Sequence, residues 1–240
     1  SLLIAVSGAI KPIFGNIIST RSKEEVNKIF DYYELGMNII TTVAFSCCIV
    51  LIVPFVGEYT KDITDANYIQ PIFAIIMCVA EAMYCYRDPF VAVAYSVGHF
   101  KQTAKYAYLE ALINIVISLS LVFVLGLIGV AIGTLVSMVF RMVMHTIYVK
   151  KNILNRPIYK WAKALLISII AGGGSIVLIM FCIKFTVASY LDWFIYVLIS
   201  AAVIVPIVIV LTFIVYHKTV ITFIKSYLCK GKKEVDSENS

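Results

Sequence analysis

The sequence predicts an all-α, multi-pass membrane protein, a bundle of about seven transmembrane helices. Two features of the composition favour this fold class: 61% of the 240 residues are hydrophobic and only 14% are charged. Soluble domains are typically ~25% charged. The mean hydropathy is +0.95. Disorder, collagen and a disulfide-stapled secreted module are excluded by this composition, and we therefore expect the chain to fold in a lipid bilayer.

Seven apolar stretches are candidates for membrane spans, since a spanning helix needs about 20 largely apolar residues. Polar segments with proline or glycine at their boundaries separate these stretches. Residues 19–28 and 57–68 are expected to form loops, and residues 217–240 a disordered tail, because this last segment is too charged to span. The predicted spans cover residues 1–19, 35–56, 69–97, 106–125, 127–149, 162–187 and 191–216.

Lysine and arginine are distributed unequally between the two ends of the predicted helices. Fifteen of the 20 basic residues fall on one side, and two, Lys61 and Lys184, fall on the other. Cytoplasmic loops carry the excess of positive charge. We therefore predict a cytoplasmic C-terminus and an outer location for residues 60–67. The net charge of +6 follows from this topology, and we assign no nucleic-acid role to it.

The distribution of polar residues divides the chain into four parts. Residues 1–149 form five spans that are expected to line a cavity, and residues 150–163 form a basic cytoplasmic loop. Residues 164–216 form two additional spans with few polar groups, which we expect at the periphery with the most lipid-exposed surface. Residues 217–240 form a basic cytoplasmic tail. Residue 1 is a serine inside an apolar run with no signal peptide before it, so we expect the chain to be part of a longer protein.

Charged and polar residues recur inside the predicted spans at helical spacing. Charges in hydrocarbon cost several kcal/mol each, so they usually face a cavity or a partner. One stripe has a polar residue at every fourth position of one span, and the next span carries a second stripe with the same spacing. The first stripe is Glu110, Asn114 and Ser118, and the second is Gly129, Gly133, Ser137, Arg141 and His145. Outside the stripes, Lys11 lies beside Pro12 in the first span, and Glu81, Arg87 and Asp88 lie in the third.

Simpler interpretations exist for several of these residues. Close helix packing explains the pair formed by Gly129 and Gly133, which is a GxxxG step. Arg141 and Glu110 lie near the predicted cytoplasmic ends of their spans, where snorkelling to the interface is the alternative to a role in a cavity. Arg87 and Asp88 can neutralise each other.

Catalysis is disfavoured, because no convergent acid–base set or nucleophile with its base is present. The six cysteines lack the spacing of metal ligands, and we expect neither a metal nor a cofactor. A simple channel is disfavoured by the absence of a repeated filter segment. Polar residues scattered over several helices are more typical of a transporter cavity.

Three motifs follow one another between residues 98 and 134: G-H-F-K-x-T at 98–103, E-A-x-x-N-x-x-x-S at 110–118 and G-x-x-G-x-x-x-G-T at 126–134. The segment that holds them resembles the bacterial flippases of lipid-linked polysaccharide repeat units. These form the polysaccharide-transporter branch of the multidrug/oligosaccharidyl-lipid/polysaccharide exporter superfamily. Residues 7–19, 53–55 and 65–71 resemble flanking segments of the same family, and the last two spans resemble it by hydropathy alone.

The resemblance implies a transporter of twelve to fourteen spans in two lobes, of which this chain would supply spans eight to fourteen. It implies translocation of an undecaprenyl-diphosphate-linked oligosaccharide across the bacterial cell membrane by alternating access. The expected partners are that lipid-linked oligosaccharide, membrane lipids and other polysaccharide-assembly proteins.

Particular roles for residues rest on physical reasoning rather than on a family motif. Cations inside a cavity would neutralise a diphosphate. The candidates for substrate binding are therefore Lys11, Arg87 and Arg141. The candidates for ion coupling or for lining the cavity are Glu81, Asp88, Glu110 and Asn114.

Three other functions remain open at this stage. A cation-coupled multidrug exporter of the same superfamily would be favoured by a cavity rich in aromatic and acidic residues with few basic ones. A membrane glycan polymerase or ligase would need a large outer loop with catalytic residues, whereas the predicted outer loops are about 3 to 13 residues long. A non-transporting scaffold is the third alternative.

Overall fold

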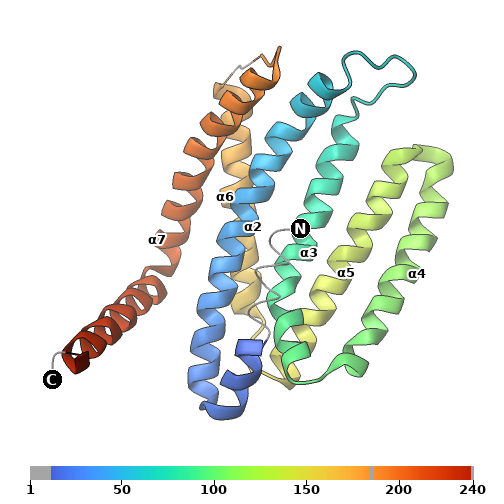
Figure 1. The fold of residues 1–240 in the computed structure, drawn as a ribbon. Coiled ribbons are helices and arrows are strands. Elements are labelled where there is room, and N and C mark those ends of the chain that lie inside the picture. The colour runs from blue at the N-terminus through green and yellow to red at the C-terminus, as the bar shows by residue number, and fades with distance from the viewer. Residues whose placement is uncertain (1–11, 184–185, 239–240) are drawn as a thin grey trace.

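The computed structural model describes residues 12–183 and 186–238, and for residues 218, 219 and 223–238 it describes the backbone alone. In these ranges the chain is all-helical. Five of the long helices, all except α3, are long and apolar enough to cross a membrane. A short helix over residues 12–20 precedes α2 (Lys23–Tyr59), α3 (Pro71–Ser96), α4 (Phe100–Leu125), α5 (Leu127–Asn152), α6 (Tyr159–Cys182) and α7 (Tyr190–Glu238) (Figure 1).

The long helices alternate in direction and lie side by side (Figure 1). Helix α4 packs on α5, α5 on α3 and α3 on α2, whereas α2, α6 and α7 pack on one another. Figure 1 accordingly shows α4 at one edge of the bundle and α7 at the other. The connections at residues 21–22, 97–99 and 153–158 lie at the same end of the bundle, together with most of the basic residues. We call this the basic end.

Helix α2 begins at a capping box rather than after a polar loop. The hydroxyl of Ser22 accepts a hydrogen bond from the backbone N–H of Glu25 at 3.3 Å, and the Glu25 carboxylate accepts one from the backbone N–H of Ser22. The loop predicted over residues 19–28 was therefore wrong. A helix of 37 residues is ~55 Å long. It extends beyond the apolar core, where charged residues are solvated without ending the helix.

The other helices also extend beyond the apolar stretches from which they were predicted. Helix α4 begins at Phe100, and α5 and α6 leave only residues 153–158 between them, so the connection is shorter than the loop expected over 150–163. The tail expected to be disordered is helical through Glu238, after a kink at Tyr216. Hydropathy marks where a helix crosses lipid, whereas backbone hydrogen bonds and local propensity decide where it ends.

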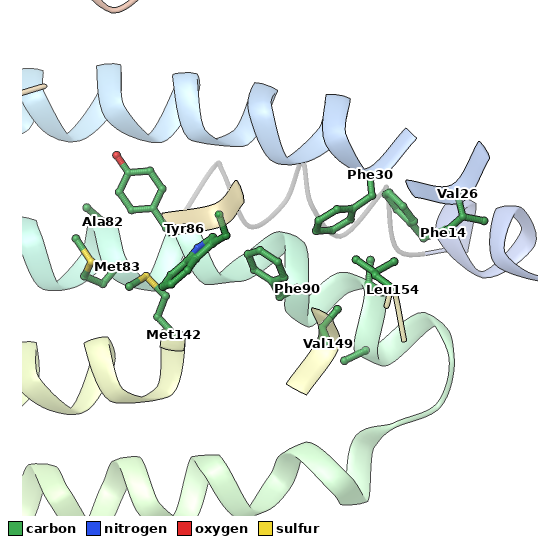
Figure 2. Packing of buried hydrophobic residues seen from close by; sticks show 13 residues of the cluster. Phe14, Val26, Phe30, Ala82, Met83, Tyr86, Phe90, Met142, Val149 and Leu154 are labelled. Atoms are coloured by element: carbon green, nitrogen blue, oxygen red, sulfur yellow. The ribbon is translucent and has the colours of Figure 1, made fainter. Parts of the chain in front are cut away.

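Two clusters of buried apolar residues hold the helices together. The first lies toward the basic end and joins α2, α3 and α5 (Figure 2). In it, the rings of Phe30 and Phe90 lie 5.4 Å apart between centroids, and Phe14 packs against Phe30 at 6.2 Å. The second cluster joins α2, α6 and α7 around Ile204 and Val208. Within a bilayer such clusters stabilise by van der Waals packing, because lipid offers an equally apolar alternative.

Small residues allow close helix contacts, as expected for Gly129 and Gly133. A Cβ on Gly129 would lie 2.5 Å from the backbone oxygen of Leu121 on α4, and one on Gly133 would lie 2.9 Å from the backbone nitrogen of Ser118. The packing interpretation of the GxxxG step is confirmed. Helices α4 and α5 are joined by Gly126 alone, which adopts a φ of 57° that favours glycine.

The most exposed of the apolar helices is α4, which corrects the expectation that the last two spans carry the most lipid-exposed surface. None of the 18-residue apolar segment of α4 is buried, against 28% in α6 and 22% in α7. The reason is position: α4 lies at an edge of the bundle and packs mainly on α5, whereas α6 and α7 both pack on α2.

Candidate functional site

A cluster of two arginines and one carboxylate joins α3, α4 and α5. Arg141 on α5 donates a hydrogen bond to Glu110 on α4. Arg87 on α3 places its Nη1 atom 3.5 Å from the other carboxylate oxygen of Glu110. The Glu110 carboxylate therefore faces two positive charges, and the buried Asp88 carboxylate next to Arg87 brings the formal charge of the four side chains to zero.

The three residues meet because their helices run in alternate directions. Each residue lies about ten positions, or roughly 15 Å, from the basic end of its helix. The predicted spans begin at residue 106 in α4 and end at residue 149 in α5, so Glu110 and Arg141 lie about one and two helical turns inside the apolar stretches. Arg141 and Glu110 do not extend to the interface: they bind each other, with side chains only 20% and 17% exposed. The snorkelling alternative is therefore not needed for either residue.

Burial leaves the arginines with unused donors. The side chain of Arg87 is 4% exposed, and its guanidinium lies 4.4 Å from the centre of the Tyr84 ring. Among the described residues, no hydrogen-bond acceptor is found for Nε of Arg87 or Nε of Arg141. Planar guanidinium groups with free N–H donors are suited to binding carboxylate or phosphate oxygens.

His145 belongs to the same environment, although sequence reasoning gave it no role of its own. It lies one helical turn after Arg141, is 1% exposed and packs edge-on against the Tyr106 ring at 5.7 Å between centroids. Neither ring nitrogen has a hydrogen-bond partner in the described part of the chain. The i, i+4 spacing from Arg141 was the signal that could have assigned it to this cluster.

The polar stripe on α4 faces protein along its length, as its spacing predicted. Ser118 donates to the side-chain oxygen of Asn114 at 2.8 Å and approaches the backbone oxygen of Val130 at 3.4 Å. Glu110 continues the stripe into the arginine cluster. Asn114 thus bonds to Ser118 on its own helix, and Ser118 makes the contact with α5.

The remaining predicted site residues do not form a single site with the arginine cluster. Glu81 lines a separate apolar cavity of about 520 Å³ between α2 and α3. Its other lining groups include Phe45, Phe73 and Tyr68, and no lysine or arginine of the described part of the chain is among them. Asp88 is buried on α3 beside Arg87. Lys11 lies outside the described residues.

A second ionic cluster, at the basic end, was missed by sequence reasoning. Arg156 donates to Asp31 on α2. Lys150, which is fully buried, lies 3.7 Å from Glu34. Both basic residues had been counted as part of a solvated loop, because their sequence neighbours are charged. The i, i+3 spacing of Asp31 and Glu34 near the apolar stretch of α2 was the available signal.

Metal chemistry finds no support in the part of the chain that the structure describes. No group of three His, Cys, Asp or Glu side chains there could hold a metal ion. The described cysteines at 47, 48, 78, 85 and 182 form no disulfide.

Fold and site together define an all-helical, multi-pass membrane protein with a buried ionic cluster between three of its helices. No protein-family model, curated protein or solved structure matches the chain.

Proposed function

We propose that the chain is part of a flippase-type transporter that moves undecaprenyl-diphosphate-linked oligosaccharides across the bacterial cell membrane. The observation that carries this proposal is the cluster of Arg87, Glu110 and Arg141 deep in the bundle. Four charged side chains inside the bundle, Arg87, Asp88, Glu110 and Arg141, cost free energy that a purely structural site would avoid. A diphosphate that crosses the bilayer is an anion that such a cluster can neutralise.

Glu110 acts in this mechanism as a counter-ion that the substrate displaces. Without substrate, the carboxylate neutralises one of the two arginines and lowers the cost of holding both in the membrane. When the diphosphate arrives, its oxygens replace the carboxylate and also accept from the unused Nε donors. The same exchange, reversed, releases the substrate at the other side.

The proposed transporter has more membrane spans than the five apolar helices. α3 is taken as a further span: its 26 residues are long enough, and its charges Glu81, Arg87 and Asp88 face the interior of the bundle. With a span before α2, the chain supplies about seven of the 12–14 helices of a two-lobed transporter. The basic end then faces the cytoplasm, in agreement with the positive-inside rule.

A translocation assay with the complete transporter in proteoliposomes tests the proposal. The readout is the appearance of a fluorescent undecaprenyl-diphosphate-linked oligosaccharide on the far leaflet. Arg87→Gln and Arg141→Gln are expected to abolish translocation, and Arg87→Lys to retain part of it, because lysine keeps the charge but loses the planar fork. Lys11→Gln tests the third candidate cation.

The matched control is Lys101→Gln, which removes one charge from an exposed position at the basic end of α4. It should translocate normally. Normal transport by the Arg87→Gln, Arg141→Gln double variant would refute the proposed role of the cluster.

The apolar cavity beside Glu81 favours a second candidate function, a cation-coupled exporter of the same superfamily. Aromatic walls with one carboxylate and no basic residue are suited to a lipophilic cation. Proteoliposomes loaded with such a cation distinguish the two functions. Efflux driven by a proton or sodium gradient and lost in Glu81→Gln supports the exporter, whereas the flippase predicts no such efflux.

A further inference from the structure

A polar cavity of about 270 Å³ lies at the basic end, apart from the arginine cluster. Helices α2, α6 and α7 enclose it. The polar residues among its walls are Asp31, Glu34, Asn38, Lys160, Lys163 and Tyr216.

The positive charge of this cavity exceeds its negative charge. Its two carboxylates are already compensated, since Asp31 accepts from Arg156 and Glu34 lies 3.7 Å from Lys150. No carboxylate within ion-pair distance of the two lysines of α6 is found among the described residues. These lysines lie at the second and fifth positions of α6, a helix with no acidic residue in its first turn and no side-chain cap. The partial positive charge of the helix N-terminus therefore adds to that of the lysines.

Two lining side chains carry polar atoms without a hydrogen-bond partner in the described part of the chain. They are Oε1 of Glu34 and the hydroxyl of Tyr216. Glu34 is only 7% exposed, so water does not readily solvate it. A ligand that brings hydroxyl donors as well as a negative charge would supply hydrogen bonds that these two groups lack within the protein.

The cavity lies beside the N-terminal end of the apolar helix α6, where lipid headgroups are expected. Tyr159 and Trp161 begin α6 at this level, in the manner of the aromatic residues that mark membrane interfaces. One to two turns further along α6, Leu166 and Ile170 are more than half exposed and apolar. A molecule with a polar head in the cavity would therefore have its hydrocarbon beside an apolar helix face.

We propose that this cavity binds an anionic phospholipid of the phosphatidylglycerol type. Its phosphate lies between Lys160 and Lys163 at the N-terminus of α6, and its headgroup hydroxyls lie toward Glu34 and Tyr216. The acyl chains run along α6. This site is independent of the transport function proposed above, because it shares no residue with the arginine cluster.

Tryptophan fluorescence tests the proposal, since the chain has two tryptophans at opposite ends of the bundle. Trp161 begins α6, and Trp193 donates to the backbone oxygen of Leu51 near the far end. The Trp193→Phe variant in bilayers of phosphatidylcholine is titrated with brominated phosphatidylglycerol or, separately, brominated phosphatidylcholine. We expect quenching of Trp161 to show preferential binding of phosphatidylglycerol. Lys160→Gln and Lys163→Gln should each weaken that preference about fivefold, the effect of one lysine near an anionic lipid.

The control variant carries Lys101→Gln and Lys105→Gln, which removes the same charge from exposed positions at the same end of the bundle. It should keep the preference. Equal quenching by both lipids, or an equal loss of preference in the control variant and in a variant that carries Lys160→Gln and Lys163→Gln together, would overturn the proposal. Loss of the preference on addition of millimolar inorganic phosphate at constant ionic strength would identify a free-phosphate site and refute the lipid.

Discussion

Lys150 on α5 lies 3.7 Å from Glu34 on α2, and its side chain is completely buried. The two groups attract each other, but at this distance they do not share a hydrogen bond. The centre of the Phe90 ring lies 5.6 Å from the ammonium group of Lys150, so a cation–π interaction also stabilises this charge.

Removal of one member of this pair is expected to destabilise the protein, whereas replacement of both members by apolar residues is expected to change its stability little. Lys150→Met should lower the free energy of unfolding by about 3 kcal/mol, because it leaves the Glu34 carboxylate buried without its counter-ion. The double variant Lys150→Met, Glu34→Leu should regain most of that loss. Thermal unfolding of the purified protein in detergent measures both. A double variant less stable than the single one would contradict this explanation.

The arginine cluster predicts an asymmetry between its members. Glu110→Gln should destabilise by about 3 kcal/mol, because two guanidiniums then lie close together with no carboxylate between them. Arg141→Gln should be milder, because Arg87 remains to pair with Glu110. The same unfolding measurement ranks the variants, and equal losses would show that the charges do not act as one cluster.

Two glycine substitutions distinguish the effect of helix packing on stability from the effect of helix propensity. Gly129→Ala should destabilise the α4–α5 contact by about 1–3 kcal/mol, because the added methyl group meets the backbone of Leu121. Gly173→Ala on α6 is the matched control: no atom lies within 4 Å of its added Cβ. It should be neutral or stabilising by up to about 1 kcal/mol. The prediction fails if both variants unfold at the same temperature.

The orientation in the membrane is tested by labelling single cysteines in intact cells. On a background without the six native cysteines, Asp62→Cys should react with a membrane-impermeant maleimide from outside. Lys151→Cys, at the basic end, should react only after permeabilisation. The opposite pattern would place the basic end outside and contradict the orientation derived from the basic residues.

Hydropathy predicted the helices but not their ends. The stripe of Asn114 and Ser118 was predicted correctly, since helical spacing alone decides which residues share a face. The burial of Lys150 could not be predicted in this way, because its partner lies on α2, more than a hundred residues away. The convergence of Arg87 and Arg141 on Glu110 likewise depends on the depth at which three helices align. The depth of a residue along the bundle can be predicted only when the ends of its helix are known.

The single-residue connection at Gly126 affects how the α4–α5 end of the bundle is positioned in the bilayer. Phe123 and Val124, at the end of α4, are 87% and 80% exposed, and no charged side chain follows them before α5 begins. Both backbone groups of Gly126 are paired, since its N–H bonds to the oxygen of Val122 and its oxygen accepts from the N–H of Gly129. Such a tip can remain immersed in hydrocarbon.

The connection between α2 and α3, at the same end of the bundle, is instead long, charged and exposed. The α4–α5 pair therefore has no polar anchor at that end to fix its height. Each of its helices is ~39 Å long, longer than the ~30 Å core of an average bilayer. We expect this hairpin, rather than the helices joined by the charged loop between α2 and α3, to change its tilt in membranes of different thickness.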